Sequence, residues 1–295
     1  MSDLNLLMSR LEKMLDRVER LLPSGQEPIE WKRALACRWR RQGHSGYLQE
    51  VSIPHRISLR DLYAIDDQKK LLDLNTRQFL FRYPYNNILL TGSKGTGKSS
   101  LIKALLNKYS KNGLRLIEVD KSDLHQLPEI IEAISNEQYR FMIFCDDLSF
   151  GSDDDAYKSL KVALDGSVAG SSENVMICAT SNRRHLMPEY MADNLEAKYR
   201  GEEIHASENV EEKISLSERF GLWIHFDGFT QDEYVKIVTY WVKKLSSGSI
   251  KPTDDVIRRS LQWALERGSR SGRIAYQFAR NEVGSELIRQ KKQVR

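Results

Sequence analysis

Hydrophobic positions near the start of the chain follow a helical spacing. Apolar residues recur there at alternating steps of three and four, on one face of a helix over residues 1–22 (Leu4, Leu7, Leu11, Met14, Val18 and Leu21). Turn residues in "LLPSGQEP" end this helix. Such an apolar face fits a helix that pairs with another chain, and the alternative is a helix whose apolar face packs on its own domain.

From residue 86 the pattern changes to short apolar runs that alternate with helical segments. The runs are "NILLTG", "LRLIEVD", "FMIFCDD", "NVMICATSN" and "GLWIHFDG". Runs that are apolar along most of their length suit a parallel sheet that helices cover on both faces. The pattern therefore predicts a three-layer α/β domain with a parallel five-stranded sheet.

Helical periodicity alone fills the chain after Phe229, with breaks near "SSGSIKPTDD" and "RGSRSG". This predicts a small α-helical domain on the C-terminal side. The expected organisation is an N-terminal helical and basic segment (residues 1–44), an α/β domain (residues 45–228) and the helical domain (residues 229–295).

Composition and charge narrow the class of protein only slightly. The 295 residues are 40% hydrophobic and 29% charged, as in an ordinary soluble globular protein. A net charge of +4 permits contact with nucleic acid or an acidic partner but does not argue for one. The cysteines lack paired spacing, so we expect free thiols in a reducing compartment. Without a signal-peptide core or a run of membrane-span length, we expect a cytoplasmic protein with no membrane contact.

A basic stretch that contains tryptophan, "WKRALACRWRRQG", follows the first helix. It interleaves Trp31 and Trp39 with Arg38, Arg40 and Arg41. Arginine beside tryptophan can bind nucleic acid by charge and stacking, so the stretch from Trp31 to Arg41 is a possible nucleic-acid contact. The alternative is a solvated basic face whose tryptophans turn inward.

A phosphate-binding loop is the clearest chemical motif. "GSKGTGKS" fits the pattern G-x-x-x-x-G-K-[ST], and it lies between a strand and a helix, as that motif requires. Loop N–H groups and the helix N-terminus are expected to cradle phosphates, Lys98 to reach the β- and γ-phosphates, and Ser99 to ligate Mg²⁺. The expected nucleotide-binding residues are Gly92, Ser93, Lys94, Gly95, Thr96, Gly97, Lys98, Ser99 and Ser100.

The second half of such a site is an acidic residue at the end of another buried strand. "FMIFCDDL" supplies Asp146, expected to hold Mg²⁺ together with Ser99, and Asp147, expected to orient or deprotonate an attacking water. A pair of aspartates at a strand end can also be a simple turn, but the phosphate loop upstream favours the functional interpretation.

The order of the motifs resembles that of an AAA+ ATPase. The motifs are "GSKGTGKSS", "FMIFCDD", "ICATSN", "LSERFG" and "SGRIAYQF". More narrowly, "NNILLTGSKGTGKSSLIKALL", "SNRRHLMPE" and "SLSERFGLWIHF" resemble a bacterial group of AAA+ proteins of uncharacterised function. The resemblance covers roughly residues 45–285. It implies a P-loop NTPase fold in which the C-terminal helices form a lid, ATP and Mg²⁺ as cofactors, and assembly into a homo-oligomer.

The resemblance also implies roles for individual residues. Asn182 matches the sensor 1 residue that positions the attacking water, and Arg219 matches an arginine finger offered to a neighbouring subunit. Arg273 stands where sensor 2 is expected, with Arg270 as a near competitor. A turn-forming asparagine and a locally paired arginine are the structural alternatives for the first two.

Two further points follow from the resemblance. "LRDLYAIDDQKKLLDLNT" resembles the segment that packs near adenine, with Tyr63, Ala64 and Ile65 as candidate contacts, although core packing explains them equally well. The second acid in the family is usually Glu, whereas here it is Asp147, whose side chain is one methylene group shorter. A carboxylate misplaced by about 1.5 Å can lower the rate about a hundredfold.

The expected function is hydrolysis of ATP, coupled to remodelling of a macromolecular partner. The residues expected to take part in the chemistry are Lys98, Asp147, Asn182, Arg219 and Arg273. Two alternatives stay open: an ATPase associated with nucleic acid, similar to helicase loaders, and a nucleotide-binding switch or adaptor that hydrolyses slowly.

Overall fold

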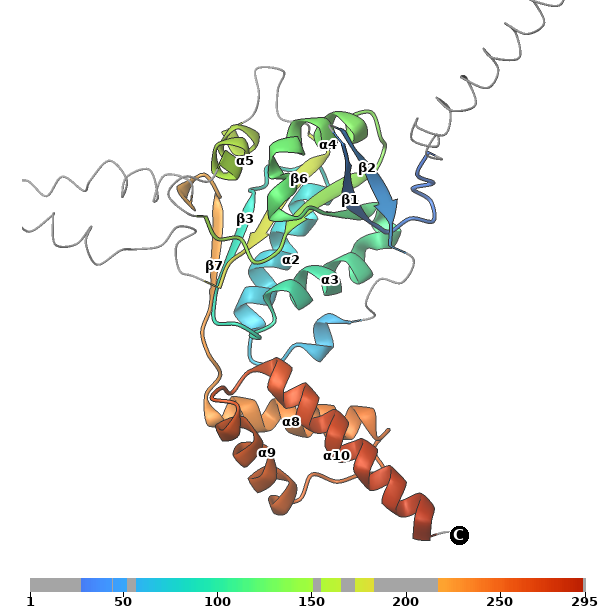
Figure 1. Ribbon diagram of the computed structural model, residues 1–295, viewed down its shortest axis with the longest axis vertical. Helices are drawn as coiled ribbons and strands as arrows, with labels where there is room; N and C mark the ends of the chain where they lie inside the picture. Colours follow the sequence, from blue (N-terminus) through green and yellow to red (C-terminus); the bar gives the residue numbers. More distant parts are fainter. Residues whose placement is uncertain are drawn as a thin grey trace, which may run out of the picture.

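The computed structural model describes residues 28–43, 45–51, 57–150, 155–165, 173–182 and 217–293 (Figure 1). A sheet flanked by helices forms one part, and a group of helices set apart from the sheet forms the other (Figure 1). The helix predicted over residues 1–22 lies outside the described residues.

The sheet of the described residues has seven strands, in the order β2-β1-β4-β5-β6-β3-β7. The five strands predicted from the apolar runs are all present and mutually parallel, which confirms the parallel α/β class. They are β3 (Ile88–Gly92), β4 (Leu114–Glu118), β5 (Arg140–Cys145), β6 (Val175–Thr180) and β7 (Leu222–Phe226). Every residue of β3, β5 and β6 is buried, as expected of strands covered on both faces.

Two strands were missed, so the prediction of five strands was wrong in number. β1 (Ala36–Gln42) runs parallel to β4, and β2 (Ser45–Glu50) pairs antiparallel with β1. The boundary expected after residue 44 falls between these two paired strands. The segment from Ala36 onward therefore belongs to the sheet and not to a separate N-terminal segment.

The basic stretch is part of this edge of the sheet, with its tryptophans turned inward. Trp31 packs edge-on against Phe141, with ring centroids 4.7 Å apart. Trp39 is buried, and its Nε1 donates to Gln126 Oε1 at 2.8 Å, while Arg38 on the other face of the strand pairs with Glu118 at 2.9 Å. The indole rings are not available to stack on bases, so the structure contradicts the stacking interpretation and supports the alternative.

Helices cover the sheet on both faces and complete three layers. On one face α2 (Asp66–Leu80) and α3 (Lys98–Tyr109) pack in a cluster with Ile88 and Leu90. On the other face α4 (Leu127–Ile134) and α5 (Asp155–Asp165) pack in a cluster with Leu89. Successive residues of β3 enter opposite clusters, as the two-residue period of a strand requires. Short 3₁₀ turns are η1 (Leu59–Asp61), η2 (Ser110–Asn112) and η3 (Lys121–Gln126).

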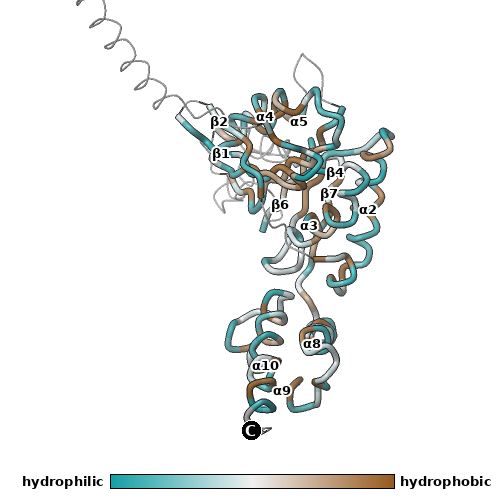
Figure 2. The backbone as a smooth tube through the Cα atoms, turned by 90° about the vertical axis from the view of Figure 1, so that its right-hand side faces the viewer, coloured by the Kyte–Doolittle hydropathy of each residue, from teal (hydrophilic) through white to brown (hydrophobic). Residues whose placement is uncertain are grey.

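Three helices form the C-terminal part that the structure describes, as predicted. They are α8 (Gln231–Leu245), α9 (Asp254–Glu266) and α10 (Gly272–Gln293), and they share a hydrophobic cluster of their own. Figure 2 shows them as a group that the chain reaches after β7. Their starts are well defined, because the hydroxyls of Thr230 and Thr253 cap the first turns of α8 and α9.

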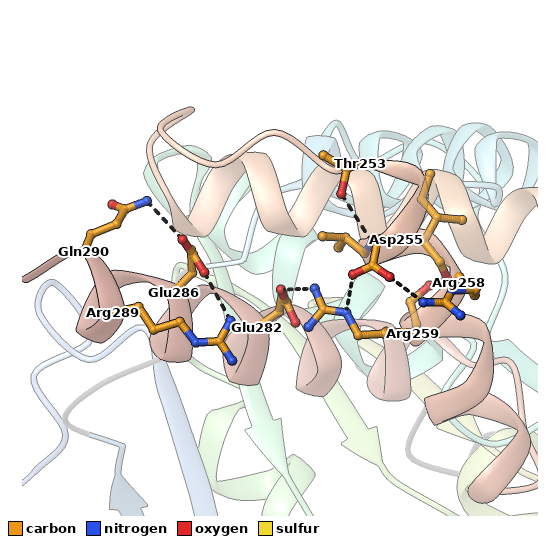
Figure 3. A network of polar contacts seen from close by, with 11 residues as sticks. Thr253, Asp255, Arg258, Arg259, Glu282, Glu286, Arg289 and Gln290 are labelled. Carbon is orange, nitrogen blue, oxygen red and sulfur yellow. Dashed lines mark hydrogen bonds and ion pairs between the residues drawn. The ribbon is translucent and has the colours of Figure 1, made fainter. Parts of the chain in front are cut away.

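An ion-pair network joins two of these helices into one unit (Figure 3). The guanidinium of Arg259 on α9 pairs with Asp255 at 3.1 Å and with Glu282 on α10 at 2.7 Å. Glu282 is largely buried, which shields its pair with Arg259 from solvent more than an exposed pair would be. Together with the shared apolar cluster, this network ties α9 to α10.

The structure also bears on the expectations about free thiols and membrane-spanning segments. Cys37, Cys145 and Cys178 are buried free thiols, and burial raises the pKa of Cys37 and of Cys145 to about 12, so neither is a reactive thiolate. None of the helices described here is long and apolar enough to cross a membrane.

Candidate nucleotide site

A cavity of about 700 Å³ lies where β3, β5 and β6 end and where the C-terminal helices approach the sheet. Its volume falls within the range of ligand-binding pockets, about 300–1,000 Å³. The lining includes the phosphate loop from Lys94 to Ser100, the two aspartates after β5, and side chains of α8 and α10. A single cavity thus contains most of the predicted site residues.

The phosphate loop joins β3 to α3 through backbone conformations that favour glycine. Gly92, Gly95 and Gly97 have φ angles of 121°, 79° and 106°. A Cβ at Gly92 would stand 2.0 Å from the carbonyl oxygen of Phe226 on β7, so the loop passes directly against that strand. The hydroxyl of Thr96 donates to the carbonyl of Ser93 at 2.8 Å and closes the loop. The loop thus presents the N-terminus of α3 to the cavity as an anion site.

Lys98 is held inside the loop and is largely buried. Its ammonium donates to the carbonyls of Gly92 at 2.7 Å and Ser93 at 2.8 Å, and to Asn182 Oδ1 at 3.1 Å. Burial lowers the pKa of Lys98, and the nearby charges of Asp147 and Asp146 oppose that shift. The ammonium is therefore fixed at the cavity wall, where it can meet a phosphate oxygen.

Ser99 and Asp146 come together as the magnesium prediction requires. Asp146 Oδ1 accepts hydrogen bonds from Ser99 Oγ at 2.7 Å and from Thr180 Oγ1 at 2.6 Å. Within the described part of the chain, no group of three or more His, Cys, Asp or Glu side chains forms a metal site. A hydroxyl and one carboxylate fit Mg²⁺, which is usually held by one or two protein oxygens together with substrate phosphates.

Asn182 bridges the ammonium and the second acid. Its Oδ1 accepts from Lys98, and its Nδ2 donates to Asp147 Oδ1 at 2.5 Å. Because an ammonium can only donate and a carboxylate can only accept, the orientation of this amide is determined. Asp147 itself has a φ of 54°, in the left-handed region, and its N–H donates to Thr180 Oγ1 at 2.9 Å.

The start of α10 lies directly on the phosphate loop. The N–H of Gly272 donates to the carbonyl of Gly95 at 3.0 Å, and Arg273 lines the cavity beside it. Arg270 instead lines a second hollow of about 380 Å³, which Ser93, Lys94 and Thr96 of the loop also line. Of the two competitors for the sensor 2 position, Arg273 is thus the one placed at the cavity.

Arg219 is not among the described residues that line the cavity. Its Nε donates to Asp165 Oδ1 on α5 at 2.6 Å, in a partly exposed ion pair. Any role of Arg219 toward a nucleotide therefore concerns the site of another subunit, and it stays a prediction.

The apolar end of the cavity is built mostly by the C-terminal helices. Tyr63 and Ile65 line it, whereas Ala64, the third candidate for adenine contact, is not among its lining residues. The sequence interpretation missed the opposite wall, which consists of Phe229, Ile237, Trp241, Leu245 and Tyr276. Three of these lie four residues apart on α8, and that spacing is the signal that would have found them.

A buried carboxylate fastens α8 to the segment before α2. Asp61 Oδ1 accepts hydrogen bonds from the hydroxyl of Tyr240 and the ammonium of Lys244, and Oδ2 accepts from the N–H of Ser58 at 2.9 Å. The Asp61 side chain is only 3% exposed. Burial alone would raise the pKa of this carboxyl, but the hydrogen bonds from Lys244, Tyr240 and Ser58 outweigh it and lower the pKa to about 2.

Replacing Asp61 with Asn is expected to lower the free energy of unfolding by about 2 kcal/mol at neutral pH. Because the pKa of Asp61 is lower in the folded state, its contribution is complete above pH 4 and is lost as the pH falls from about 4 toward 2. Urea unfolding of wild type and Asp61→Asn at several pH values measures this difference. A difference that stays constant down to pH 3 would contradict the assignment, and Asp67→Asn, an exposed position on α2, is the control.

The parallel sheet, the phosphate loop between β3 and α3 and the acids after β5 make up a P-loop NTPase fold, and the C-terminal helices lie beside its cavity. Solved structures that match this chain include RuvB of Thermotoga maritima, described as a Holliday junction branch migration motor, at 17% identity and a TM-score of 0.44. A single-substitution variant of that RuvB matches at 16% identity and the same TM-score. Both matches cover 76% of this chain and 63% of that chain.

A structure described as a DNA replication initiation factor matches at 15% identity and a TM-score of 0.47, over 80% of this chain and 68% of that chain. This chain spans less than two thirds of the RuvB chain. No curated protein matches the sequence. Residues 32–286 match the family described as "Protein of unknown function (DUF815)", and because this match covers most of its length, the chain belongs to that family.

Proposed function

We propose that this protein is an AAA+ ATP hydrolase that binds ATP with Mg²⁺ in the cavity and couples hydrolysis to remodelling of a macromolecular partner. The observation that carries the proposal is the chain of contacts in which Asn182 joins Lys98 of the phosphate loop to Asp147 after β5. A structural turn would not require a buried ammonium, an amide of fixed orientation and a carboxylate to meet in one cavity.

The residues of the chain divide the work by their chemistry. Loop N–H groups bind the phosphates, and the Lys98 ammonium offsets their charge. Ser99 and Asp146 would hold Mg²⁺, which supplies charge neutralisation at the phosphate oxygens when bound. Asp147 accepts the proton of the attacking water, and its bond from Asn182 fixes the direction of the carboxylate.

The lid gives the site a second wall and a means of sensing its occupant. Trp241 and Tyr276 line the cavity together with Tyr63 and Ile65, and this apolar lining suits the flat, apolar faces of adenine. Arg273 begins the helix that touches the phosphate loop, so its charge can pull α10 toward the γ-phosphate. In this proposal Arg219 serves the site of a neighbouring copy, and the active species is a homo-oligomer.

Replacing Asp147 with Asn tests the proposed chemistry. Asparagine tolerates a φ of 54° and still accepts from Asn182, but it cannot take a proton from water. Turnover of ATP with Mg²⁺ is expected to fall about a hundredfold, with little change in the affinity for ATP. The measurement is phosphate release together with equilibrium binding of a fluorescent ATP analogue.

Asp120→Asn is the matched control, because Asp120 follows β4 as the acidic pair follows β5 but does not line the cavity. Equal Mg²⁺-dependent turnover in wild type and Asp147→Asn would contradict the proposed role of Asp147. Absence of nucleotide binding in wild type would contradict the whole proposal.

A nucleotide switch is the second candidate, and the shorter acid at position 147 is the observation that favours it. An aspartate places its carboxylate about 1.5 Å short of a glutamate, and errors of that size can cost about a hundredfold in rate. Tight binding of ATP with negligible turnover in wild type would establish this alternative.

A further inference from the structure

Thr180 is a buried residue that contacts both acids of the site. It is the last residue of β6 and is 1% exposed. Its hydroxyl donates to Asp146 Oδ1 at 2.6 Å and accepts from the N–H of Asp147 at 2.9 Å. Its backbone carbonyl accepts from the N–H of Leu148 at 2.7 Å. One residue of β6 thus holds three successive residues after β5.

The two hydroxyl bonds of Thr180 have a fixed direction. The carboxylate of Asp146 can only accept and the N–H of Asp147 can only donate, so the single hydroxyl proton must point at Asp146. A bond to an ionised carboxylate is stronger than one between neutral groups. The hydroxyl therefore defines the direction of the Asp146 carboxylate as well as the course of the backbone that follows.

Asp147 needs such support because of its backbone conformation. A φ of 54° is rare for a residue with a side chain, and such conformations persist where surrounding contacts over-determine them. Two contacts do so here: Thr180 holds the N–H of Asp147, and Asn182 holds its carboxylate. Both come from the end of β6 and the residues just after it.

Ser99 and Thr180 donate to the same oxygen of Asp146. If the hydroxyl of Ser99 turns to a metal ion, as proposed above, the bond from Thr180 is the one that still orients Asp146. We propose that Thr180 is a positioning residue that directs Asp146 toward Mg²⁺ and fixes Asp147 beside it. This inference rests on the proposed ATP and Mg²⁺ site, and it gives a role to a second residue of "ICATSN", in which the sequence analysis assigned a role only to Asn182.

The test measures metal affinity separately from nucleotide affinity. Mn²⁺ titrated into protein with ADP, followed by its electron paramagnetic resonance signal, reports the metal site, and ADP binding in EDTA reports the phosphate loop. Thr180→Val keeps the shape of the side chain but removes the hydroxyl, and it is expected to weaken Mn²⁺ binding about 10- to 100-fold, the usual effect of losing a partner of a metal ligand. ADP affinity in EDTA is expected to change less than about twofold, because Thr180 does not contact the loop.

Thr180→Ser restores the hydroxyl and is expected to bring Mn²⁺ affinity back to within about threefold of wild type. Thr76→Val is the matched control, because Thr76 is equally buried and its hydroxyl donates to the carbonyl of Leu72 within α2. If Thr180→Val does not fold, Thr180→Ala provides the same comparison. Alanine also lacks the hydroxyl, and it places no γ-methyl group against the N–H of Asp147.

Equal Mn²⁺ affinity in wild type and Thr180→Val would overturn the inference. It would also be overturned if Thr76→Val weakened Mn²⁺ binding as much, since the effect would then be a general loss of stability. Failure of the proposed function has a different signature: wild type itself would bind neither ADP in EDTA nor Mn²⁺ with ADP.

Discussion

Arg219→Ala is expected to lower ATP turnover about a thousandfold at protein concentrations that favour assembly, with little change in ATP affinity. The reason is that a guanidinium offers fixed charge to a transferring phosphoryl group, whereas Arg219 does not line the cavity of its own chain among the described residues. Its ion pair with Asp165 lies near the surface and holds the side chain outside that cavity.

A dilution series of wild type and Arg219→Ala measures this effect. Turnover per subunit of wild type is expected to rise with protein concentration, because in the proposed function each site uses the Arg219 of a neighbouring subunit. Arg77→Ala is the control, since it also removes one ion pair from a partly exposed arginine, at 3.3 Å from Asp73 on α2. Constant turnover per subunit on dilution, with an active Arg219→Ala, would exclude a shared site.

Gly92→Ala is expected to lower the free energy of unfolding by at least about 4 kcal/mol, at the severe end of single substitutions. A Cβ at this position would stand 2.0 Å from the carbonyl oxygen of Phe226 and 2.8 Å from its carbon. Both atoms belong to the backbone of β7, which pairs with β3 at this residue, so neither can move without opening the sheet. The φ of 121° adds conformational strain.

Gly113→Ala separates the two causes. Gly113 has a φ of 93°, but a Cβ there meets nothing within 4 Å, so only the backbone conformation is penalised, at about 1–2 kcal/mol. Urea unfolding measures the free energy of unfolding of both variants. The difference between the two values is the energetic cost of the close approach of the loop to β7. Equal destabilisation in the two variants would show that the loop and β7 separate easily.

The strands from β3 to β7 could be predicted because burial on both faces leaves an uninterrupted apolar run in the sequence. β1 lies toward an edge and has one solvated face, so arginines alternate there with Cys37 and Trp39. The charged residues suggested a contact with nucleic acid. The alternation of buried and solvated residues at every second position instead indicates a β-strand.

The phosphate loop and the acids after β5 could be placed in advance because each is a local pattern at the end of a strand. The contact between α8 and the segment before α2 could not be predicted, since Asp61 and Lys244 are 183 residues apart and only the fold brings them together. Thr180 was missed for another reason. A threonine in a buried strand looks like any other β-branched residue, and its hydroxyl acquires a role only through Asp146 and Asp147, which follow β5.

Helix α10 begins on the phosphate loop and continues for 22 residues, which makes it about 33 Å long at 1.5 Å per residue. The network around Arg259 keeps α9 attached to it. With its first turn as the fulcrum, a rotation of about 10° carries its far end about 6 Å, by the length just given. In the proposed function, a shift of the phosphate loop by a fraction of a helical turn would therefore be enlarged at the far end of α10, where a neighbouring subunit or a partner would meet it.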